Sequence, residues 1–325
     1  MPEAYELTVG VDVAKDKLDA ATATQAWGSF DNAPAGHAKL VNRLPAPRTV
    51  LVVMEATGGY ERALVAALVE AGHHVAVVNP RQVRDFAKGI GLLAKTDTLD
   101  ALAIARFGEV VKPVPKVFDK DQEELRELIL RRRQLVEHRT AEKNRLQTVI
   151  SDTGRKSLQR SIKESGLEIK RIEKALLALV ANDDDWRDKY ERIKAVPGVG
   201  QQTAATLVAE LPELGQLNRQ AISALVGVAP LNDDSGQRNG QRHVWGGRAG
   251  VRCTLYMAAL SAITHNPVIA QFAKRLYAKG KKAKVVITAC MRKLLVILNT
   301  MVREGVDWSP RLAVPAASAP LPEQG

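Results

Sequence analysis

The sequence predicts an α/β domain followed by all-α segments, and three features of the 325-residue chain lead to this fold class. Over about the first 110 residues, short β-branched runs alternate with segments of helical spacing, as in a mixed sheet covered by helices. The prolines of Lys-Pro-Val-Pro, residues 112–115, end this pattern, because proline removes a backbone donor. From there to about residue 305, the apolar residues recur at helical spacing.

The elements expected in the first domain begin with ELTVGVDVA, residues 6–14, where β-branched residues alternate with small and polar ones. Further strands are expected at 26–30, 48–55 and 73–80, and helices at 36–45, 60–72, 81–89 and 97–110. Strands come first in the chain and then alternate with helices. The sheet should therefore be mixed, with both antiparallel and parallel neighbours.

Two long helical segments follow, at 119–150 and 165–183, with an apolar spacing close to a heptad. They predict a helical hairpin or coiled-coil arm that acts as a spacer or a dimer contact. Residues 193–211, IKAVPGVGQQTAATLVAEL, then predict two helices around a Pro-Gly-Val-Gly turn. In a helix-hairpin-helix, such glycines let the backbone approach a phosphate. An ordinary tight turn between helices gives the same pattern.

The boundaries between these segments predict four parts of the chain. They are an α/β domain at 1–112, the helical arm at 113–190, a mostly helical C-terminal domain at 191–310 and a tail at 311–325. The tail is rich in Pro and Ala, a composition typical of disordered segments.

Charge is distributed unevenly along the chain, which has a net charge of +11. Residues 235–325 contain 14 Lys and Arg against 3 Asp and Glu, whereas residues 1–110 contain 11 against 13. A basic C-terminal quarter favours a polyanionic partner, most often a nucleic acid. The alternative is a solvated basic surface that aids solubility.

The composition also excludes several classes of protein. Two cysteines, Cys253 and Cys290, are too few for a disulfide framework or a zinc ligand set. No run reaches the roughly 18 uncharged apolar residues that span a bilayer. The N-terminal residues lack the basic segment and apolar stretch of a secretory signal. We therefore expect a cytoplasmic protein with no membrane partner.

Four acidic residues stand at positions typical of a metal site. Asp97 and Asp100, in LLAKTDTLDALAIARF, share a face of the predicted helix. At about 6 Å they repel by roughly 3 kcal/mol at an effective dielectric of 20, and a divalent cation such as Mg²⁺ would offset this. A helix start capped by Thr96 explains Asp97 but not Asp100. Asp12 lies within the strand of TVGVDVAKD, and Glu55 ends the strand LVVME, at a place where α/β proteins carry their sites.

These motifs and others downstream resemble the DEDD-type insertion-sequence transposases, a family associated with a bridge RNA and related to the pilin-gene invertase. The matching motifs are, in order, GVDVAKD, MEATGGY, VVNP, KTDTLDA, VPGVGQQTAATLVAEL, LVGVAPLNDDSG and GGRAGVRCTLYMAAL. The resemblance covers about residues 6–305. It implies an RNase H-like fold for the N-terminal domain, similar to RuvC-type Holliday-junction resolvases, and a DNA transposase or site-specific recombinase that is guided by a bridge RNA.

The resemblance also implies the roles of individual residues. Ser235, in APLNDDSGQRNG, matches the serine nucleophile of the family, although a serine in such a turn is usually only a turn residue. Asp12, Glu55, Asp97 and Asp100 match the acids that hold Mg²⁺. Together they imply a composite site in which Ser235 forms a phosphoserine link with DNA. The resemblance further implies a homodimer, a tetramer in the synapse, and a site assembled between subunits.

Ten basic residues are candidate nucleic-acid contacts. Four of them follow Ser235 within 17 residues: Arg238, Arg242, Arg248 and Arg252. Arginine binds phosphate bidentately. The other six surround Gly280: Lys274, Arg275, Lys279, Lys281, Lys282 and Lys284. A solvated loop is the alternative for the second group. His243-Val244-Trp245 stands where the family more often has a small polar segment before Gly-Gly-Arg. For Trp245 we favour packing over stacking on a base or ribose.

Two further interpretations compete with the transposase. The first keeps the fold and the metal but uses water, which makes the protein a metal-dependent, junction-resolving nuclease. The second is a non-enzymatic nucleic-acid scaffold in which the acids are structural. A covalent protein–DNA adduct separates the recombinase from the nuclease, and metal-dependent cleavage separates both enzymes from the scaffold.

Overall fold

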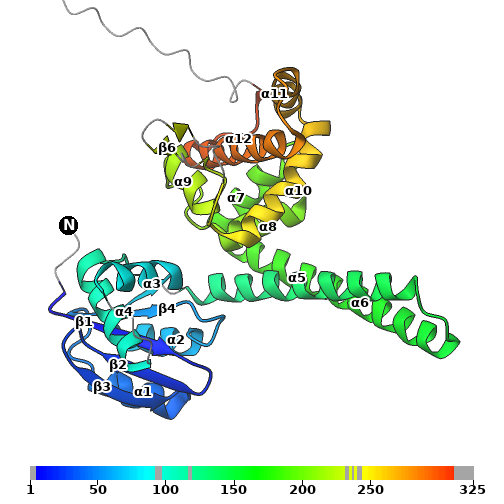
Figure 1. Ribbon diagram of the computed structural model, residues 1–325. Helices are drawn as coiled ribbons and strands as arrows, with labels where there is room; N and C mark the ends of the chain where they lie inside the picture. Colours follow the sequence, from blue (N-terminus) through cyan, green and yellow to red (C-terminus); the bar gives the residue numbers. More distant parts are fainter. Residues whose placement is uncertain are drawn as a thin grey trace, which may run out of the picture. The chain divides into compact units, whose positions relative to one another are not determined.

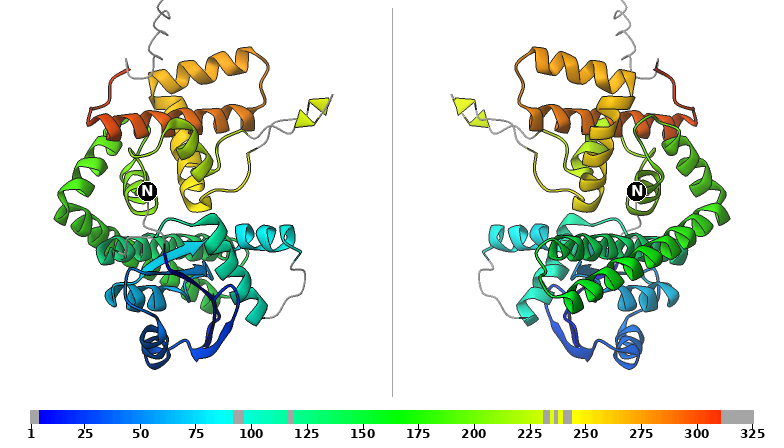
Figure 2. Two further views of the ribbon diagram at one scale, coloured as in Figure 1. Left: turned by 90° about the vertical axis from the view of Figure 1, so that its left-hand side faces the viewer. Right: turned by 90° about the vertical axis from the view of Figure 1, so that its right-hand side faces the viewer.

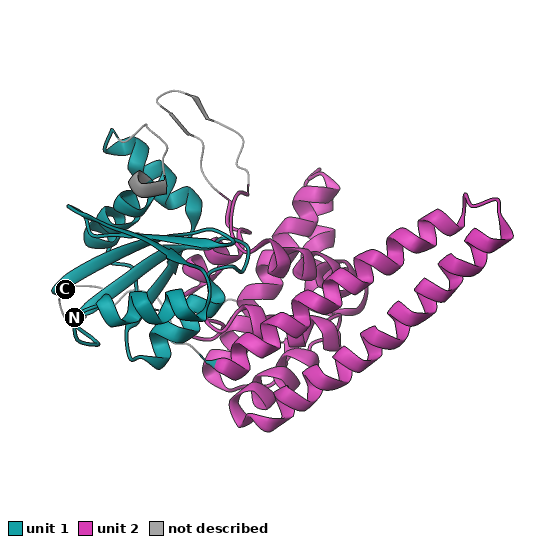
Figure 3. Ribbon diagram, turned by 90° about the horizontal axis from the view of Figure 1, so that it is seen from below, with its two compact units in different colours: residues 1–119 teal, residues 120–325 magenta. Residues whose placement is uncertain are grey.

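The computed structural model of the chain describes residues 5–91, 97–115, 119–230, 234–235, 238–239 and 244–310. The side chains of 97–99, 234–235 and 238–239 lie outside this description, and so does the tail expected at 311–325. The chain divides into two units, Met1–Asp119 and Lys120–Gly325 (Figure 3). The further division into an arm at 113–190 and a domain at 191–310 stays a prediction.

Unit 1 is built on a five-stranded mixed sheet with the strand order β3-β2-β1-β4-β5 (Figure 1). The strands are β1 (Leu7–Val13), β2 (Lys17–Ala21), β3 (Ala26–Asp31), β4 (Val50–Glu55) and β5 (His74–Val78). β2 pairs antiparallel with β1 and β3, whereas β4 pairs parallel with β1 and β5. The mixed sheet predicted from the sequence is thus confirmed.

Four helices among the described residues of unit 1 bury the two faces of this sheet. They are α1 (Pro34–Arg43), α2 (Arg62–Glu70), α3 (Pro80–Gly89) and α4 (Asp97–Val111). Val9 and Val11 of β1 lie in one core with Leu40 of α1 and Leu64 of α2. The other face carries a second core, which joins residues of β4 and β5 to α3 and α4: Leu51, Val53, Ala76, Val78, Val83, Ile104 and Phe107. Each strand therefore alternates between a face toward α1 and α2 and a face toward α3 and α4.

The sequence pattern misses β2, which pairs with β1 through Gly10 to Val13. Its residues, Lys-Leu-Asp-Ala-Ala, include no β-branched or aromatic side chain and favour a strand only weakly. Hydrogen bonding to both neighbours fixes this segment as a strand. As a result, its residue Asp19 is absent from the candidate site residues.

Unit 2 is mainly helical (Figure 2). Its helices are α5 (Lys120–Leu146), α6 (Asp152–Asn182), α7 (Asp184–Lys194), α8 (Gln201–Glu210), α9 (Arg219–Val226), α10 (Ala249–His265), α11 (Pro267–Ala278) and α12 (Ala283–Glu304), with the short strands β6 (Asp234–Ser235) and β7 (Arg238–Asn239). α5 and α6 form an antiparallel hairpin that projects from the other helices of the unit (Figure 3). α6 begins earlier than the predicted residue 165, because the Ser151 hydroxyl caps it by accepting from the backbone N–H of Gly154 at 3.1 Å.

The core of unit 2 extends from the base of the hairpin to the last helix. Leu125 of α5 and Leu176 of α6 belong to the same buried cluster as Leu207 of α8 and Leu298 of α12. Among the described helices, α12 alone is long and apolar enough to cross a membrane by length and composition. Its residues Leu294 and Leu298 are fully buried in this cluster, so α12 packs as a core helix of the unit.

Candidate active site

Asp12 and Glu55 lie beside each other at the carboxyl ends of two parallel strands. β1 and β4 run in register with Val11 opposite Met54, so Asp12 and Glu55 are the next residues of each strand. Val11 and Met54 lie in the core under α1 and α2. Because successive side chains alternate between faces, Asp12 and Glu55 point to the face that carries α4. Both side chains are partly buried.

The close packing of α4 against β1 determines where this helix begins. A Cβ atom on Gly10 would lie 2.2 Å from the carbonyl oxygen of Ala101 and 2.4 Å from the backbone nitrogen of Ala105. Further along the helix, Gly108 lies against side chains of Thr8 and Val53. Later residues of α4 thus pack against earlier residues of β1. The N-terminal end of α4 therefore lies toward the end of β1 that carries Asp12 (Figure 1).

The predicted acids of unit 1 therefore come from one edge of the sheet and the helix start that faces it. Asp100, in the first turn of α4, is partly buried, whereas the side chain of Asp97 lies outside the described residues. Among the described side chains, no three Asp, Glu, His or Cys residues are placed to hold one metal ion. Carboxylate oxygens are nevertheless the ligands that Mg²⁺ prefers, so the donor set fits this ion, and the metal site stays a prediction.

Ser235 lies in a short hairpin of unit 2. It is the last residue of β6 and pairs with Arg238, the first residue of β7. Within the predicted turn, Asp234 and Ser235 form a short strand, with the backbones of Ser235 and Arg238 side by side. The side chains of both residues, and the whole of Arg242, lie outside the described residues.

Arg248 and Arg252, two predicted phosphate contacts, make bonds within unit 2. The Arg248 guanidinium donates to both carboxylate oxygens of Glu213, at 2.6 and 2.5 Å, and to the carbonyl oxygen of Glu210 at 2.8 Å. Arg252 donates to the carbonyl oxygens of Gly246 and Val226. These bonds fix the segment that leads into α10 onto α8 and α9, which is a structural role the sequence does not reveal. Trp245, three residues before Arg248, is 59% exposed, which does not fit the packing favoured from the sequence.

The Glu213–Arg248 pair predicts a pH dependence of stability. Burial disfavours the charged form of Glu213, but the hydrogen bonds and charge of Arg248 outweigh it and lower the pKa of this carboxyl. The stabilisation that ionised Glu213 gives to the folded state is therefore complete above the pKa of glutamate in the unfolded chain, about 4.3. It is lost as the pH falls through the lower pKa of Glu213 in the folded state. Glu213→Gln should flatten the fall in unfolding free energy of unit 2 below about pH 5, measured by urea unfolding from pH 3 to 7. Arg248→Met leaves Glu213 buried without its partner, so it should flatten the fall at least as much, and an unchanged slope in both variants would contradict this role.

The six basic residues around Gly280 gather at one turn of unit 2. Lys274 and Arg275 lie on α11, Lys279 to Lys282 form the connection, and Lys284 lies in the first turn of α12. All six are exposed, and residues 267–284 contain no acid. The Arg275 guanidinium lies 5.5 Å from the centre of the Phe272 ring. Such a surface suits contact with a phosphate backbone.

The predicted helix-hairpin-helix turn joins α7 to α8, and its two glycines differ. Gly198 has φ +90°, and a Cβ on it would lie 2.5 Å from the Cα of Ala262 in α10. Beside it, the Asn266 side chain donates to the carbonyl oxygen of Pro197 at 3.2 Å. The absence of a side chain at Gly198 is therefore explained by packing against α10. Gly200, at the N-cap of α8, has nothing within 4 Å of its Cβ position and is the glycine that could approach a phosphate.

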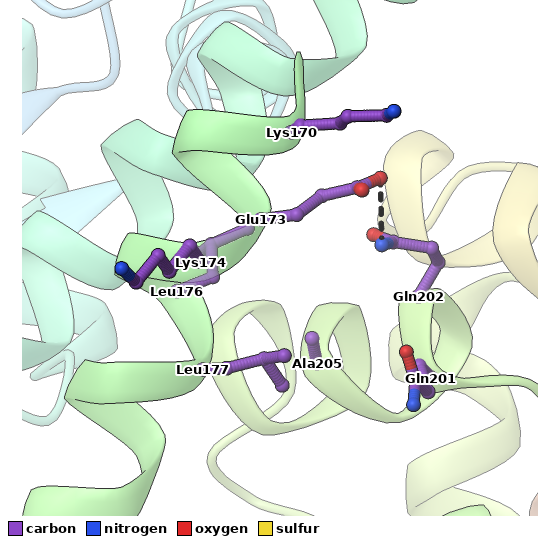
Figure 4. A pocket seen from close by; sticks show the side chains of 8 residues that line it. All are labelled: Lys170, Glu173, Lys174, Leu176, Leu177, Gln201, Gln202 and Ala205. Carbon is purple, nitrogen blue, oxygen red and sulfur yellow. Dashed lines mark hydrogen bonds between the residues drawn. The ribbon is translucent and has the colours of Figure 1, made fainter. Parts of the chain in front are cut away.

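A cavity of about 280 Å³ between α6 and α8 is a site that the sequence does not predict (Figure 4). Its rim carries Lys170 and Lys174 of α6 together with Gln202 of α8. The Glu173 carboxylate accepts from the Gln202 amide at 2.9 Å and from the Arg132 guanidinium at 2.8 Å. These bonds tie α5, α6 and α8 together, so the polar groups of the cavity hold the base of the hairpin.

Comparison with known proteins identifies two domains in the chain. A family model described as a transposase, DEDD_Tnp_IS110, matches residues 9–154. A second model, described as the transposase IS116/IS110/IS902 family, matches residues 190–274. The first contains Asp12, Glu55, Asp97 and Asp100, and the second contains Ser235.

Similar proteins of known name cover most of the chain. Pilin gene-inverting proteins of Moraxella lacunata and Moraxella bovis are each 26% identical over 321 residues, which is 94% of this chain and 98% of theirs. A transposase for the insertion sequence element IS1111A of Coxiella burnetii is 25% identical over 264 residues, 71% of this chain and 70% of its own. The chain thus carries the two domains of IS110-family transposases, and it is an enzyme of DNA transposition or recombination.

Proposed function

We propose that this enzyme cuts and rejoins DNA strands through a phosphoserine intermediate at Ser235, assisted by Mg²⁺ that Asp12, Glu55, Asp97 and Asp100 hold. The observation that supports this most strongly is the register of β1 and β4, which sets Asp12 beside Glu55 on the face where α4 begins. The four acids lie within residues 9–154, which the first transposase model matches, and Ser235 lies within residues 190–274, which the second matches. An RNase H-like fold for unit 1 belongs to the same proposal.

The chemistry proceeds in two balanced steps. The Ser235 oxygen attacks a phosphorus atom of the DNA backbone, and one P–O bond to deoxyribose breaks. The serine hydroxyl gives its proton to a carboxylate of the site, and the sugar oxygen leaves as a hydroxyl by taking up that proton. Mg²⁺, when bound, neutralises the phosphate and favours the ionised serine. In the second step the hydroxyl of another strand attacks the phosphoserine and releases the Ser235 hydroxyl, so no external energy source is needed.

In this proposal, basic side chains bind the phosphates of the nucleic acids, and base pairing recognises their sequence. Arg238 and Arg242 follow the serine in the sequence and would hold the attacked phosphate. The exposed cluster around Gly280 would hold the backbone without reading its sequence. A bridge RNA would then supply sequence specificity to donor and target DNA. A homodimer that forms a tetramer in the synapse, and a cytoplasmic location, complete the proposal.

The alternative function uses the same acids without the serine. A metal-dependent nuclease would hydrolyse junction DNA with water, and Ser235 would only shape the β6–β7 hairpin. The two functions differ in one product, because only the serine mechanism attaches the protein to DNA.

An adduct assay tests the proposal. The full chain is mixed with the ends of its element, target DNA, the flanking non-coding RNA and Mg²⁺, and is then denatured. We expect wild type and Ser261→Ala, an exposed serine on α10, to yield protein attached to DNA, and Ser235→Ala and Asp97→Ala to yield none. Cleavage without an adduct that survives Ser235→Ala but not Asp97→Ala would replace the recombinase with the water-using nuclease.

A further inference from the structure

Asp19 lies directly opposite Asp12 in the antiparallel pair of β1 and β2. Opposed residues of such a pair have their Cβ atoms about 4.5–5.5 Å apart and share one face of the sheet. Leu18 and Ala20, on either side of Asp19, lie in the core under α1 and α2. Asp19 therefore faces the α4 side, as Asp12 does, and it is 7% exposed.

Two neighbours hold the Asp19 carboxylate in place. The Lys17 ammonium lies 2.9 Å from Oδ2 of Asp19. Ser29 of β3, which is opposite Asp19 in the sheet, donates its hydroxyl hydrogen to Oδ1. One register row across four strands thus contains Ser29, Asp19, Asp12 and Glu55, with Lys17 close to it.

This arrangement is unfavourable for a strand pair that only needs to be stable. Like charges directly opposite each other destabilise a sheet, and a buried carboxylate needs bonds that an apolar residue would not. Lys17 offsets part of this charge with a side chain that is 47% exposed. Every negative charge near Asp12 strengthens the binding of a divalent cation there, and every positive charge weakens it.

We propose that Asp19 is a positioning residue of the metal site, which acts through Asp12: its charge strengthens divalent-cation binding at Asp12, and Lys17 weakens that binding. The inference rests on the proposed function, since it takes the acids of unit 1 to bind a metal ion. Ser29 fixes the orientation of Asp19 without adding charge. Asp19→Asn and Lys17→Met should therefore change metal affinity in opposite directions.

The test measures binding of Mg²⁺ and Mn²⁺ to the full chain without nucleic acid, by titration calorimetry. We expect Asp19→Asn to raise the dissociation constant by about tenfold, in the range known for residues that support metal ligands. Lys17→Met, which keeps the aliphatic part of the side chain, should lower the dissociation constant several-fold. Ser29→Ala keeps all charges and should stay within about twofold. Thermal unfolding of each variant confirms that it folds.

The controls separate this inference from the metal site itself. Asp12→Asn should abolish binding, and wild-type protein without measurable binding would contradict the metal site and, with it, the inference. If wild type binds and Asp12→Asn does not, while Asp19→Asn and Lys17→Met both keep the wild-type constant, the role of Asp19 alone is overturned. The same holds if the two variants shift the constant in the same direction, because a purely structural ion pair is broken equally by either substitution.

Discussion

Replacing Gly10 with alanine is expected to lower the free energy of unfolding of unit 1 by about 3 kcal/mol. The new Cβ would lie 2.2 Å from the carbonyl oxygen of Ala101 and 2.4 Å from the backbone nitrogen of Ala105, where ordinary contacts begin near 3.4 Å. Backbone atoms cannot rotate away as a side chain can, so α4 would move from β1 as a whole. Calorimetry should show the unfolding midpoint of unit 1 lower by roughly 10 °C.

The displacement should also affect the candidate site. α4 carries Asp97 and Asp100 in its first turn, whereas Asp12 and Glu55 stay with the sheet. Metal affinity of folded Gly10→Ala protein should therefore fall, measured by titration at a temperature well below its midpoint. This second effect distinguishes a shift of α4 from a simple loss of stability.

Two other glycines of unit 1 provide matched controls. Gly89, at the end of α3, has nothing within 4 Å of its Cβ position, so Gly89→Ala should change stability by less than about 1 kcal/mol. Gly108 meets side chains of Thr8 and Val53, not backbone, and these can rotate in part. The unfolding midpoint of Gly108→Ala should therefore lie between those of the other two variants. Equal midpoints for Gly10→Ala and Gly89→Ala would show that α4 does not pack on β1 as described.

The strands whose pattern is local could be predicted from the sequence. Residues 6–14 and 48–55 are rich in Val, and this local pattern alone predicts a buried strand. β2 could not be predicted, because Lys-Leu-Asp-Ala-Ala becomes a strand through pairing with β1 and β3 on either side. The position of Asp19 opposite Asp12 follows from that pairing, so the sequence alone did not suggest Asp19 for the site.

Residues of the candidate site that depend on short local motifs could be predicted from the sequence, and those that depend on distant partners could not. The place of Asp12 and Glu55 in two strands follows from short motifs, and the parallel register of those strands brings them together. Arg248 has the same sequence signal as a phosphate contact, but Glu213 pairs with it from 35 residues away. No periodicity reports such a pair. The roles of Ser235 and of the four acids stay predictions.

Replacing Gly198 with alanine is expected to destabilise unit 2 by about 3 kcal/mol, as the sum of two effects. A φ of +90° strains any residue with a side chain, by about 1–3 kcal/mol. The new Cβ would also lie 2.5 Å from the Cα and 2.6 Å from the backbone nitrogen of Ala262, which forces the turn away from α10. The hydrogen bond from Asn266 to Pro197 would be lost with it. The midpoint of unit 2 should fall by roughly 9 °C in thermal unfolding.

Gly200→Ala, two residues away in the same turn, is the decisive comparison. Gly200 has φ −89° and open space at its Cβ position, so alanine there should cost less than about 1 kcal/mol. If the turn approaches a phosphate, Gly200→Ala should weaken nucleic-acid binding in a filter or anisotropy assay while the unfolding midpoint hardly changes. If both binding and midpoint stay at the wild-type value, the turn only joins α7 to α8. In that case the Pro-Gly-Val-Gly motif owes its first glycine to Ala262 of α10, and the basic cluster around Gly280 becomes the first nucleic-acid contact to test.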